Sequence, residues 1–297
     1  MRQLQEPNNA NLIFDNVINP KQEVLCYEAL WSNINGISLS NMEKLLDRKR
    51  LPSELLQYIP KDIVNSVINF LDNLQTYQFN VLFRGTVEYP CSLMDIEIPL
   101  LYFKGDLSLI ESRCVSVVGA RKASQRGLDA AARISKTLTA EGFTVVSGLA
   151  SGIDTAAHIA AIDAGGYTIG VIGTPITHFY PKENINLQQK IAKDYLLLSH
   201  VPFFKYSKQN NNLNRFFFPE RNKIMAALSK ATIIAEASDT SGSHHQAKEC
   251  LRLGRQLIIL KHVYDNKALK WPENYVSNGA LVAQTPNEII KILHNGK

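Results

Sequence analysis

Short apolar runs alternate with amphipathic stretches along the chain after residue 113. The runs are rich in β-branched residues, which is typical of strands buried on both faces of a parallel sheet. This pattern predicts strands over the following residues: 115–118, 144–147, 168–172, 195–198, 232–235, 256–260 and 281–282. Helical spacing between them predicts helices over these residues: 124–141, 153–164, 219–229, 243–253 and 286–294. The alternation indicates an α/β protein with a doubly wound, mostly parallel sheet.

The first part of the chain has a different pattern. Residues 1–20 are rich in Asn and Pro and are expected to form a mobile lead-in. Apolar positions at helical spacing predict a small domain of short helices over 21–77. Residues 78–112 lose this spacing and are interpreted as a linker that contains one or two short strands. The α/β domain is therefore expected to occupy residues 113–297.

The composition excludes several classes of protein. Of the 297 residues, 45% are hydrophobic and 20% are charged, as in globular proteins and unlike disordered or collagen-like chains. The four cysteines have no paired CxxC spacing, so neither a metal site nor a disulfide scaffold is expected. The chain has no signal-peptide pattern and no apolar run of membrane-spanning length, which predicts a cytoplasmic protein without a membrane partner.

The net charge of +5 is small, but one segment carries most of it. Residues 202–223 hold five cations against the single acid Glu220, a net charge of 5 − 1 = +4. Aromatic residues interleave with these cations. This combination favours single-stranded nucleic acid, because cations bind phosphates and ring faces stack on unpaired bases. Three rings are candidates for base stacking: Phe216, Phe217 and Phe218. The alternative is that the aromatic side chains are core and the cations a solvated rim.

The loops that follow the predicted strands are where a doubly wound sheet binds its ligands. After the strand at 115–118, Gly119 allows a tight turn and Ser124 is placed to cap the next helix. Arg121 and Lys122 lie between them, and a helix N-terminus beside two cations is a candidate phosphate site. The sequence contains neither a GxGxxG fingerprint nor a Walker lysine motif, so no cofactor is expected.

Two further loops carry polar candidates. Ser147 and Gly148 precede a helix on which Asp154 and His158 share one face. This pair is interpreted as a structural brace for the loop, although an acid–base pair or part of a metal site would have the same spacing. In the second loop, Lys182 precedes a helix start, where either phosphate binding or plain solvation would suit it.

The loop after the strand at 232–235 is rich in small hydroxyl residues. Ser241, Gly242 and Ser243 precede a helix and are expected to form an anion cradle. His244 and His245 follow as candidates for catalysis. No Ser or Cys nucleophile in a recognisable elbow accompanies them, so no catalytic residue is assigned.

These motifs, in this order, resemble those of the DNA-processing protein A family, also called DprA or Smf. The resemblance runs from about residue 80 to 260 and rests on these segments: Tyr89-Pro90, 101–105 (LYFKG), 117–121 (VVGAR), 145–154 (VVSGLASGID), 156–158 (AAH), Gly173-Thr174, 180–184 (YPKEN), 218–224 (FPERNKI) and 241–243 (SGS). It implies an extended Rossmann-like domain after a small helical, SAM-like N-terminal domain.

The resemblance also implies a function and its partners. Members of this family bind single-stranded DNA without catalysis, protect incoming strands in natural transformation and help to load a RecA-type recombinase. They typically form homodimers through the Rossmann-like domain. By motif, Arg121 and Lys182 would hold DNA phosphates, and Arg221 and Lys223 would line the same basic pocket. The full set of residues expected at the phosphates is Gly119, Arg121, Lys122, Ser147, Gly148, Lys182, Asn184, Arg221, Asn222, Lys223, Ser241, Gly242 and Ser243.

The chain departs from the family pattern in four places, one of which is the acid Glu220 inside the basic segment. His244-His245-Gln246 stand where hydrophobic residues are usual, residues 261–264 (KHVY) replace a Pro-Gly pair, and no room is left for the winged-helix tail of longer members. A divergent member could instead act in a phage-defence or toxin–antitoxin locus through a protein partner. A nucleotide-processing or nucleotide-sensing enzyme is a further alternative. Glu249 would then be a remnant acid, although the Gly-Gly-x-Gly-Thr-x-x-Glu signature of such enzymes is absent.

Overall fold

The computed structural model describes residues 19–33, 46, 51–74, 78–84, 86–96 and 98–295. Apart from its last two residues, the lead-in expected over 1–20 lies outside the described residues, and helix α1 (Pro20–Asn33) begins directly after Asn19. Within the described part of the chain, no helix is long and apolar enough to cross a membrane.

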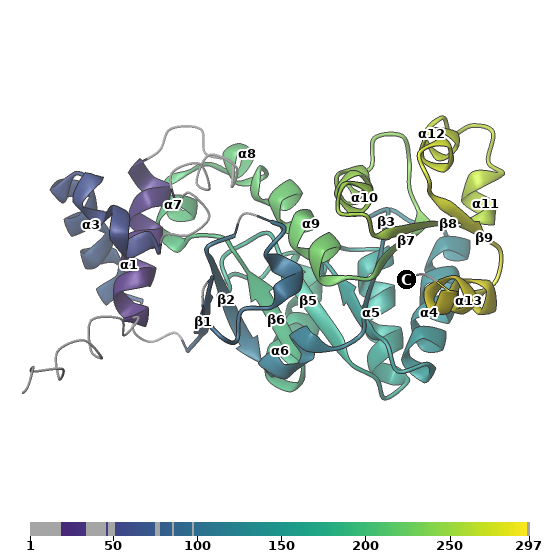
Figure 1. The fold of residues 1–297 in the computed structure, drawn as a ribbon, viewed down its shortest axis with the longest axis horizontal. Helices are drawn as coiled ribbons and strands as arrows, with labels where there is room; N and C mark the ends of the chain where they lie inside the picture. The colour runs from purple at the N-terminus through teal and green to yellow at the C-terminus, as the bar shows by residue number, and fades with distance from the viewer. Residues whose placement is uncertain are drawn as a thin grey trace, which may run out of the picture.

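The described residues form a nine-stranded sheet that runs through the molecule in the order β1-β2-β6-β5-β4-β3-β7-β8-β9 (Figure 1). Its parallel part consists of β3 (Cys114–Gly119), β4 (Thr144–Ser147), β5 (Thr168–Ile172), β6 (Leu196–Ser199), β7 (Ala231–Glu236), β8 (Gln256–Leu260) and β9 (Leu281–Ala283). The predicted α/β fold with a doubly wound, mostly parallel sheet is confirmed.

Two antiparallel strands extend the sheet beyond β6. β1 (Asn80–Phe83) pairs with β2 (Leu100–Gly105), and β2 pairs with β6, so that Tyr102 lies opposite Ser199. Both strands come from the segment 78–112 that the sequence pattern indicates as a linker with short strands. The pattern predicts strands there, but it carries no sign that they complete the sheet of the α/β domain.

Helices cover both faces of the sheet. α4 (Gln125–Ala140) packs on α5 (Ile153–Asp163) and α13 (Pro286–Asn295), and α9 (Phe217–Leu228) packs on α10 (Ser243–Arg252) on the opposite face (Figure 1). The strands between these layers are apolar and fully buried, for example at Val145, Ile169 and Ile258. Each Å² of apolar surface that they remove from water contributes about 25 cal/mol to the stability of the fold.

The other helical segments are η2 (Pro52–Tyr58), α3 (Lys61–Asp72), η3 (Cys91–Leu93), η4 (Leu107–Glu111), η5 (Lys182–Asn184), α6 (Ile185–Asp194), α7 (Phe203–Lys208), α8 (Asn211–Asn214), α11 (Lys261–Tyr264) and α12 (Trp271–Ser277). α7, α8, α11 and α12 are not predicted from the sequence. Each spans one or two turns, which is too short to produce a helical period in the apolar pattern.

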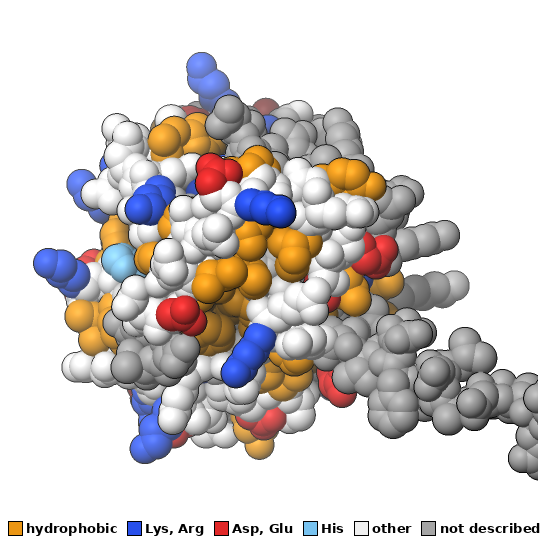
Figure 2. Space-filling model, turned by 90° about the vertical axis from the view of Figure 1, so that its left-hand side faces the viewer, with side chains coloured by type: hydrophobic (Ala, Val, Ile, Leu, Met, Phe, Trp, Pro, Cys, Tyr) orange, Lys and Arg blue, Asp and Glu red, His pale blue; other side chains and the backbone are white. Residues whose placement is uncertain are grey.

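The N-terminal helices are held to the sheet by aromatic side chains. α1 and α3 lie at the end of the molecule far from the C-terminus, and both contact α7 (Figure 1). Phe204 of α7 lies 5.3 Å from Phe70 of α3 between ring centroids, and Phe217 of α9 lies 5.5 Å from Trp31 of α1. Figure 2 views this end of the molecule, where apolar side chains gather at the centre and charged ones are scattered around them.

Candidate nucleic-acid interface

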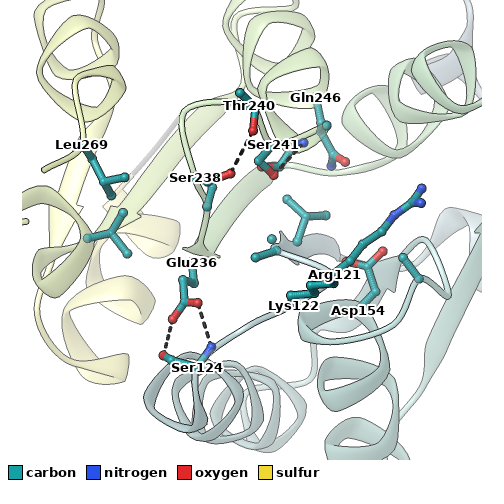
Figure 3. A pocket seen from close by; sticks show the side chains of 18 of the residues that line it. Arg121, Lys122, Ser124, Asp154, Glu236, Ser238, Thr240, Ser241, Gln246 and Leu269 are labelled. Carbon is teal, nitrogen blue, oxygen red and sulfur yellow. Dashed lines mark hydrogen bonds between the residues drawn. The ribbon is translucent and has the colours of Figure 1, made fainter.

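A cavity of about 1090 Å³ opens at the carboxyl ends of two neighbouring strands, β3 and β7 (Figure 3). Gly119 ends β3 and Glu236 ends β7, and both line this cavity. The chain proceeds from β3 through β4, β5 and β6 in one direction across the sheet, and from β7 through β8 and β9 in the other. The loops of the two strands therefore diverge, and such a switch point is where open α/β sheets bind ligands.

Three exposed cations line this cavity: Arg121, Lys122 and Arg126. None of them forms an ion pair with any residue that the structure describes. Arg121 and Lys122 follow β3 directly, and Arg126 is in the first turn of α4. Their charges are therefore available to an anion that enters from solvent.

The acids of the cavity, in contrast, are all engaged by the protein. Asp154 Oδ2 accepts from Gly148 N at 3.1 Å, Glu236 Oε1 accepts from Ser124 N at 2.8 Å, and Asp265 Oδ1 accepts from Lys261 Nζ at 3.1 Å. A carboxylate that already has hydrogen-bond donors repels an incoming phosphate less than a bare one, because part of its charge is compensated. The cavity therefore offers an anion three cations without ion-pair partners among the described residues, while its three acids already accept hydrogen bonds from the protein.

Arg121 is held in place by an aromatic ring. Its guanidinium carbon lies 5.4 Å from the centroid of Phe218, a distance typical of a cation–π contact. Phe218 packs beside Tyr180, with 5.9 Å between the ring centroids. A Cβ atom on Gly173 would lie 2.6 Å from Phe218 Cδ1, so glycine at this position leaves the room that the ring needs. Phe218 thus positions a cation, and its ring lies within the cavity wall.

The opposite wall is the turn before α10, where Ser241 Oγ lies 2.8 Å from Ser243 Oγ (Figure 3). Asn222 on α9 donates to Gly242 O at 3.1 Å, which ties this turn to the neighbouring helix. The predicted cradle residues Ser241, Gly242 and Ser243 all line the cavity, as does Asn222. The structure therefore brings these four predicted residues together with Arg121 and Lys122.

Arg221 lies in the floor of the cavity rather than reaching out of it. It is 5% exposed, and its Nη1 donates to Val171 O at 2.8 Å. Burial lowers its pKa to about 10, and the nearby Asp154 carboxylate opposes this shift. A Cβ atom on Gly148 would lie 1.6 Å from Arg221 Nη1, so the predicted phosphate-binding residue Gly148 instead makes room for this side chain.

Two residues predicted to bind phosphate have their side chains engaged inside the protein, which corrects that prediction. Ser147 is fully buried, and its Oγ donates to Val117 O at 2.7 Å. Asn184 is 4% exposed, and its Nδ2 donates to Leu149 O and Thr155 Oγ1, both at 2.8 Å. These side chains satisfy buried carbonyl groups near the loop, and their hydrogen-bonding groups are not available to DNA.

Lys182 and Lys223 lie outside this cavity. Lys223 Nζ pairs with Glu220 Oε2 at 2.7 Å, so the acid within the basic segment neutralises it. Lys182 is exposed and follows Tyr180 and Pro181, which line a second, smaller cavity together with Arg121. That Lys182 binds phosphate therefore stays a prediction. Its neighbours Tyr180 and Pro181 lie on the same side of the site as Arg121.

The three candidate stacking rings have three different environments. Phe217 is 5% exposed and packs against Trp31 and His200, so the prediction that it stacks on bases is wrong. Phe216, its neighbour, is 69% exposed. Phe218 is half-buried beneath Arg121. Successive residues on a helix point about 100° apart, which sends one ring into the core and leaves the next in solvent.

Asp154 and His158, the pair considered for acid–base chemistry, have structural partners. His158 Nδ1 lies 2.6 Å from Thr168 Oγ1, and burial lowers its pKa to about 3, so it is neutral at physiological pH. Asp154 braces the loop, as expected, but through Gly148 N rather than His158. Burial raises the pKa of Asp154, and the Arg221 charge opposes this shift.

Two more catalytic candidates, Glu249 and His244, are also engaged, whereas His245 is exposed to solvent. Glu249 Oε2 pairs with Arg252 Nε at 2.7 Å. His244 stacks on Tyr275 with 5.8 Å between ring centroids, and its Nε2 lies 2.9 Å from Ser238 O. Among the described residues, no group of three or more His, Cys, Asp or Glu side chains is arranged to hold a metal ion.

Sequence reasoning missed several residues of the cavity. Glu236 and Arg126 line it, as do His262, Asp265 and Asn266 on and after α11. The position of Glu236 at the end of an apolar strand was a usable signal, because the carboxyl ends of parallel strands face the ligand side. The same signal was present for the residues of α11, which directly follow the predicted strand at 256–260, the neighbour of β7 in the sheet.

Two DNA processing proteins are among the solved structures that this chain resembles. DNA processing protein A from Streptococcus pneumoniae superposes with a TM-score of 0.65 at 28% sequence identity, and the match covers 91% of this chain and 92% of that one. DNA processing protein A from Helicobacter pylori, described with a unique single-stranded DNA binding mode, superposes with a TM-score of 0.62 at 23% identity and covers 73% and 96% of the two chains. The second similarity establishes the fold alone.

Sequence comparison extends the relationship. The chain is 42% identical to the S. pneumoniae DNA processing protein DprA over 58% of this chain and 59% of that protein, so this match spans less than two thirds of the relative. It is 32% identical to the Bacillus subtilis DprA over 82% and 79% of the two chains, and 30% identical to the Smf protein of Synechocystis over 90% and 72%. The family model for DNA recombination-mediator protein A matches residues 80–294. The chain therefore belongs to the DNA recombination-mediator protein A family, the DprA/Smf family whose motifs it carries.

Proposed function

We propose that this protein is a single-stranded DNA-binding accessory factor of recombination and DNA uptake. It protects single strands in the cytoplasm and helps to load a RecA-type recombinase, acting as a homodimer and without catalysis of its own. The observation that carries this proposal is the distribution of paired and unpaired charges in the cavity at the switch point. Arg121, Lys122 and Arg126 are unpaired among the described residues, while the acids beside them are engaged.

The site suits a phosphodiester backbone. Arg121 and Lys122 neutralise phosphates on one wall. On the other wall the hydroxyl groups of Ser241 and Ser243 are hydrogen-bonded to each other, which leaves one hydroxyl proton to donate to a phosphate. None of these groups requires a particular base, so the binding depends little on sequence. Tyr180, which packs beside Phe218, is 43% exposed, and Phe216, two residues before Phe218 in the chain, is 69% exposed; both offer faces on which unpaired bases stack.

The proposal is tested by fluorescence anisotropy with labelled oligo-dT. The wild-type protein binds at low salt, and Arg121→Ala and Lys122→Ala each weaken binding. Lys193→Ala removes an exposed cation from α6, outside the cavity, and serves as the matched control with near wild-type affinity. Absence of oligonucleotide binding by the folded wild-type protein at low salt refutes the proposal.

The recombinase and homodimer parts of the proposal have their own tests. Sedimentation velocity of the full chain checks the dimer, and a purified RecA-type recombinase mixed with the protein and oligo-dT checks loading. The description of the family as DNA recombination-mediator proteins supports the recombination setting. A protein from a defence locus would instead bind a protein partner and fail to accelerate recombinase assembly.

A further inference from the structure

The N-terminus of α4 already holds an anion that belongs to the protein. Glu236, at the end of β7, directs its carboxylate at Ser124, the residue that caps α4 (Figure 3). Its Oε1 accepts from Ser124 N at 2.8 Å, and its Oε2 accepts from Ser124 Oγ at 2.5 Å. α4 is sixteen residues long, so its N-terminus carries the partial positive charge of a full helix.

The chain around this carboxylate is shaped to receive it. A Cβ atom on Gly127 would lie 2.4 Å from Glu236 Oε2, so glycine on the first turn of α4 leaves space for the acid. The backbone of Glu236 is fixed as well, because its carbonyl accepts from Ala120 N at 2.7 Å. The β3–β7 register shifts between Val118 and Gly119, directly opposite Glu236, and such an irregularity re-aims the side chains at a strand end.

This position is the one at which a doubly wound fold ordinarily receives a phosphate. The helix that follows the strand at the switch point turns its free N–H groups toward the ligand, and the helix dipole favours negative charge there. In this protein Ser124 N, the donor at that point, is satisfied by Glu236. A phosphate that enters the cavity is therefore left with the other groups, which are the cations Arg121, Lys122 and Arg126 and the turn before α10.

We propose that Glu236 is a specificity-determining residue of this cavity, which selects phosphodiester groups within a strand over terminal phosphate groups. This inference rests on the proposed function and names the substrate class of the same site. A diester carries one negative charge, whereas a terminal phosphate carries about 1.5 to 2 at pH 7. The fixed carboxylate occupies Ser124 N and Oγ, so these donors cannot compensate the second charge of a terminal phosphate, and the part of its own charge that is not compensated opposes a dianion more than a diester. Mononucleotides and inorganic phosphate are thereby excluded, while a continuous strand is retained.

The test is a competition experiment with three versions of the full chain. Labelled oligo-dT is bound to wild type, Glu236→Ala and Glu236→Gln, and is displaced by thymidine monophosphate or inorganic phosphate, with chloride used to match ionic strength. Wild-type protein is expected to resist both competitors. Glu236→Ala empties the position at Ser124, and the competitor concentration for half displacement should fall on the order of tenfold, as expected for a dianion at a partly buried helix N-terminus.

Glu236→Gln removes the charge but keeps the shape and an acceptor for Ser124 N, so it should weaken the selectivity less than Glu236→Ala. Asp129→Asn is the matched control, since it removes one negative charge from an exposed position of α4 that does not line the cavity. This control should keep the wild-type resistance. Equal resistance in wild type and both Glu236 variants, with oligo-dT binding retained, overturns the inference.

A second measurement tests the inference even if the Glu236 variants are less stable than wild type. Thermal unfolding of Glu236→Ala is compared in phosphate and in chloride at equal ionic strength. Phosphate that fills the vacated position raises the melting temperature of the variant and leaves that of wild type unchanged. The same shift in both proteins, or in neither, contradicts the inference. Failure of the proposed function has a different signature, because wild-type protein then does not bind oligo-dT at all.

Discussion

The carboxylate of Glu28 on α1 accepts the backbone N–H of Phe203 at the start of α7, with 2.8 Å between Oε1 and N. Its second oxygen accepts from Phe204 N at 2.8 Å, and Tyr102 donates its hydroxyl to Oε1 at 2.6 Å. Glu28 is fully buried. The first helix of the chain thus caps a helix 175 residues away, and this contact joins the N-terminal helices to the sheet.

This contact predicts a pH-dependent stability. Burial raises the pKa of Glu28 from 4.5 to about 7, while the hydrogen bonds from Tyr102, Phe204 and Phe203 oppose the shift. The folded protein therefore holds this proton more tightly than the unfolded chain. The stabilising contribution is complete below about pH 4.5 and is lost as pH rises through about 7. Glu28→Gln does not titrate, so wild type should lose roughly 2 kcal/mol relative to this variant between pH 5 and pH 8.

Urea unfolding of wild type and Glu28→Gln at both pH values measures this difference. The comparison between the two proteins cancels the titration of the buried histidines His158 and His200, which are present in both. If wild type and Glu28→Gln differ in stability by the same amount at pH 5 and pH 8, the raised pKa of Glu28 is contradicted.

Gly148→Ala tests the close approach of Arg221 to the loop after β4. The added methyl group would lie 1.6 Å from Arg221 Nη1, so the buried guanidinium must move away from Val171 O. Displacing a buried charged group from its hydrogen bond is expected to cost about 3 kcal/mol of stability. Gly242→Ala is the matched control, because its Cβ would meet nothing within 4 Å and its φ of −61° suits alanine. Chemical denaturation of the two variants should separate them clearly, and equal midpoints refute the assigned role of Gly148.

Phe217→Ala and Phe216→Ala should have opposite effects. Phe217 is 5% exposed, so its removal leaves a cavity in the core and costs about 3–5 kcal/mol of stability. Phe216 is 69% exposed, so Phe216→Ala should change stability by less than about 0.5 kcal/mol. If the Phe216 ring stacks on a base, this variant instead loses about 1–3 kcal/mol of binding free energy for oligo-dT. Thermal melts and anisotropy on both variants measure these effects, and a stable Phe217→Ala protein would contradict the packing.

The salt dependence of DNA binding should report the cations of the cavity. Each phosphate neutralised by a single-strand binder contributes about −0.7 to the slope of log K against log salt concentration. The double variant Arg121→Ala, Lys122→Ala should therefore have a slope that is less steep by about 1.4 than that of wild type. Titrations with oligo-dT at several chloride concentrations measure it. An unchanged slope would mean that these two cations do not contact phosphates.

Much of the fold follows from local pattern. The strands at 144–147, 168–172 and 256–260 have the bounds that their apolar runs predict, because a strand buried on both faces is mostly apolar. The helix expected over 124–141 likewise matches α4, whose N-cap Ser124 was visible in the sequence. Such features depend on neighbours within a few residues, and the sequence alone determined them.

The partners of the polar residues were decided by tertiary structure. The strand order brings Glu236 to Ser124 across 112 residues and Glu28 to Phe203 across 175, and no local pattern encodes which strands and helices become neighbours. The basic and aromatic segment 202–223 was visible as composition. Only packing decided that Phe217 enters the core and that Lys223 is neutralised by Glu220. The sequence thus determined the sheet, the helices and the kind of charge present, whereas the contacts between distant elements decided which charges remain free for a ligand.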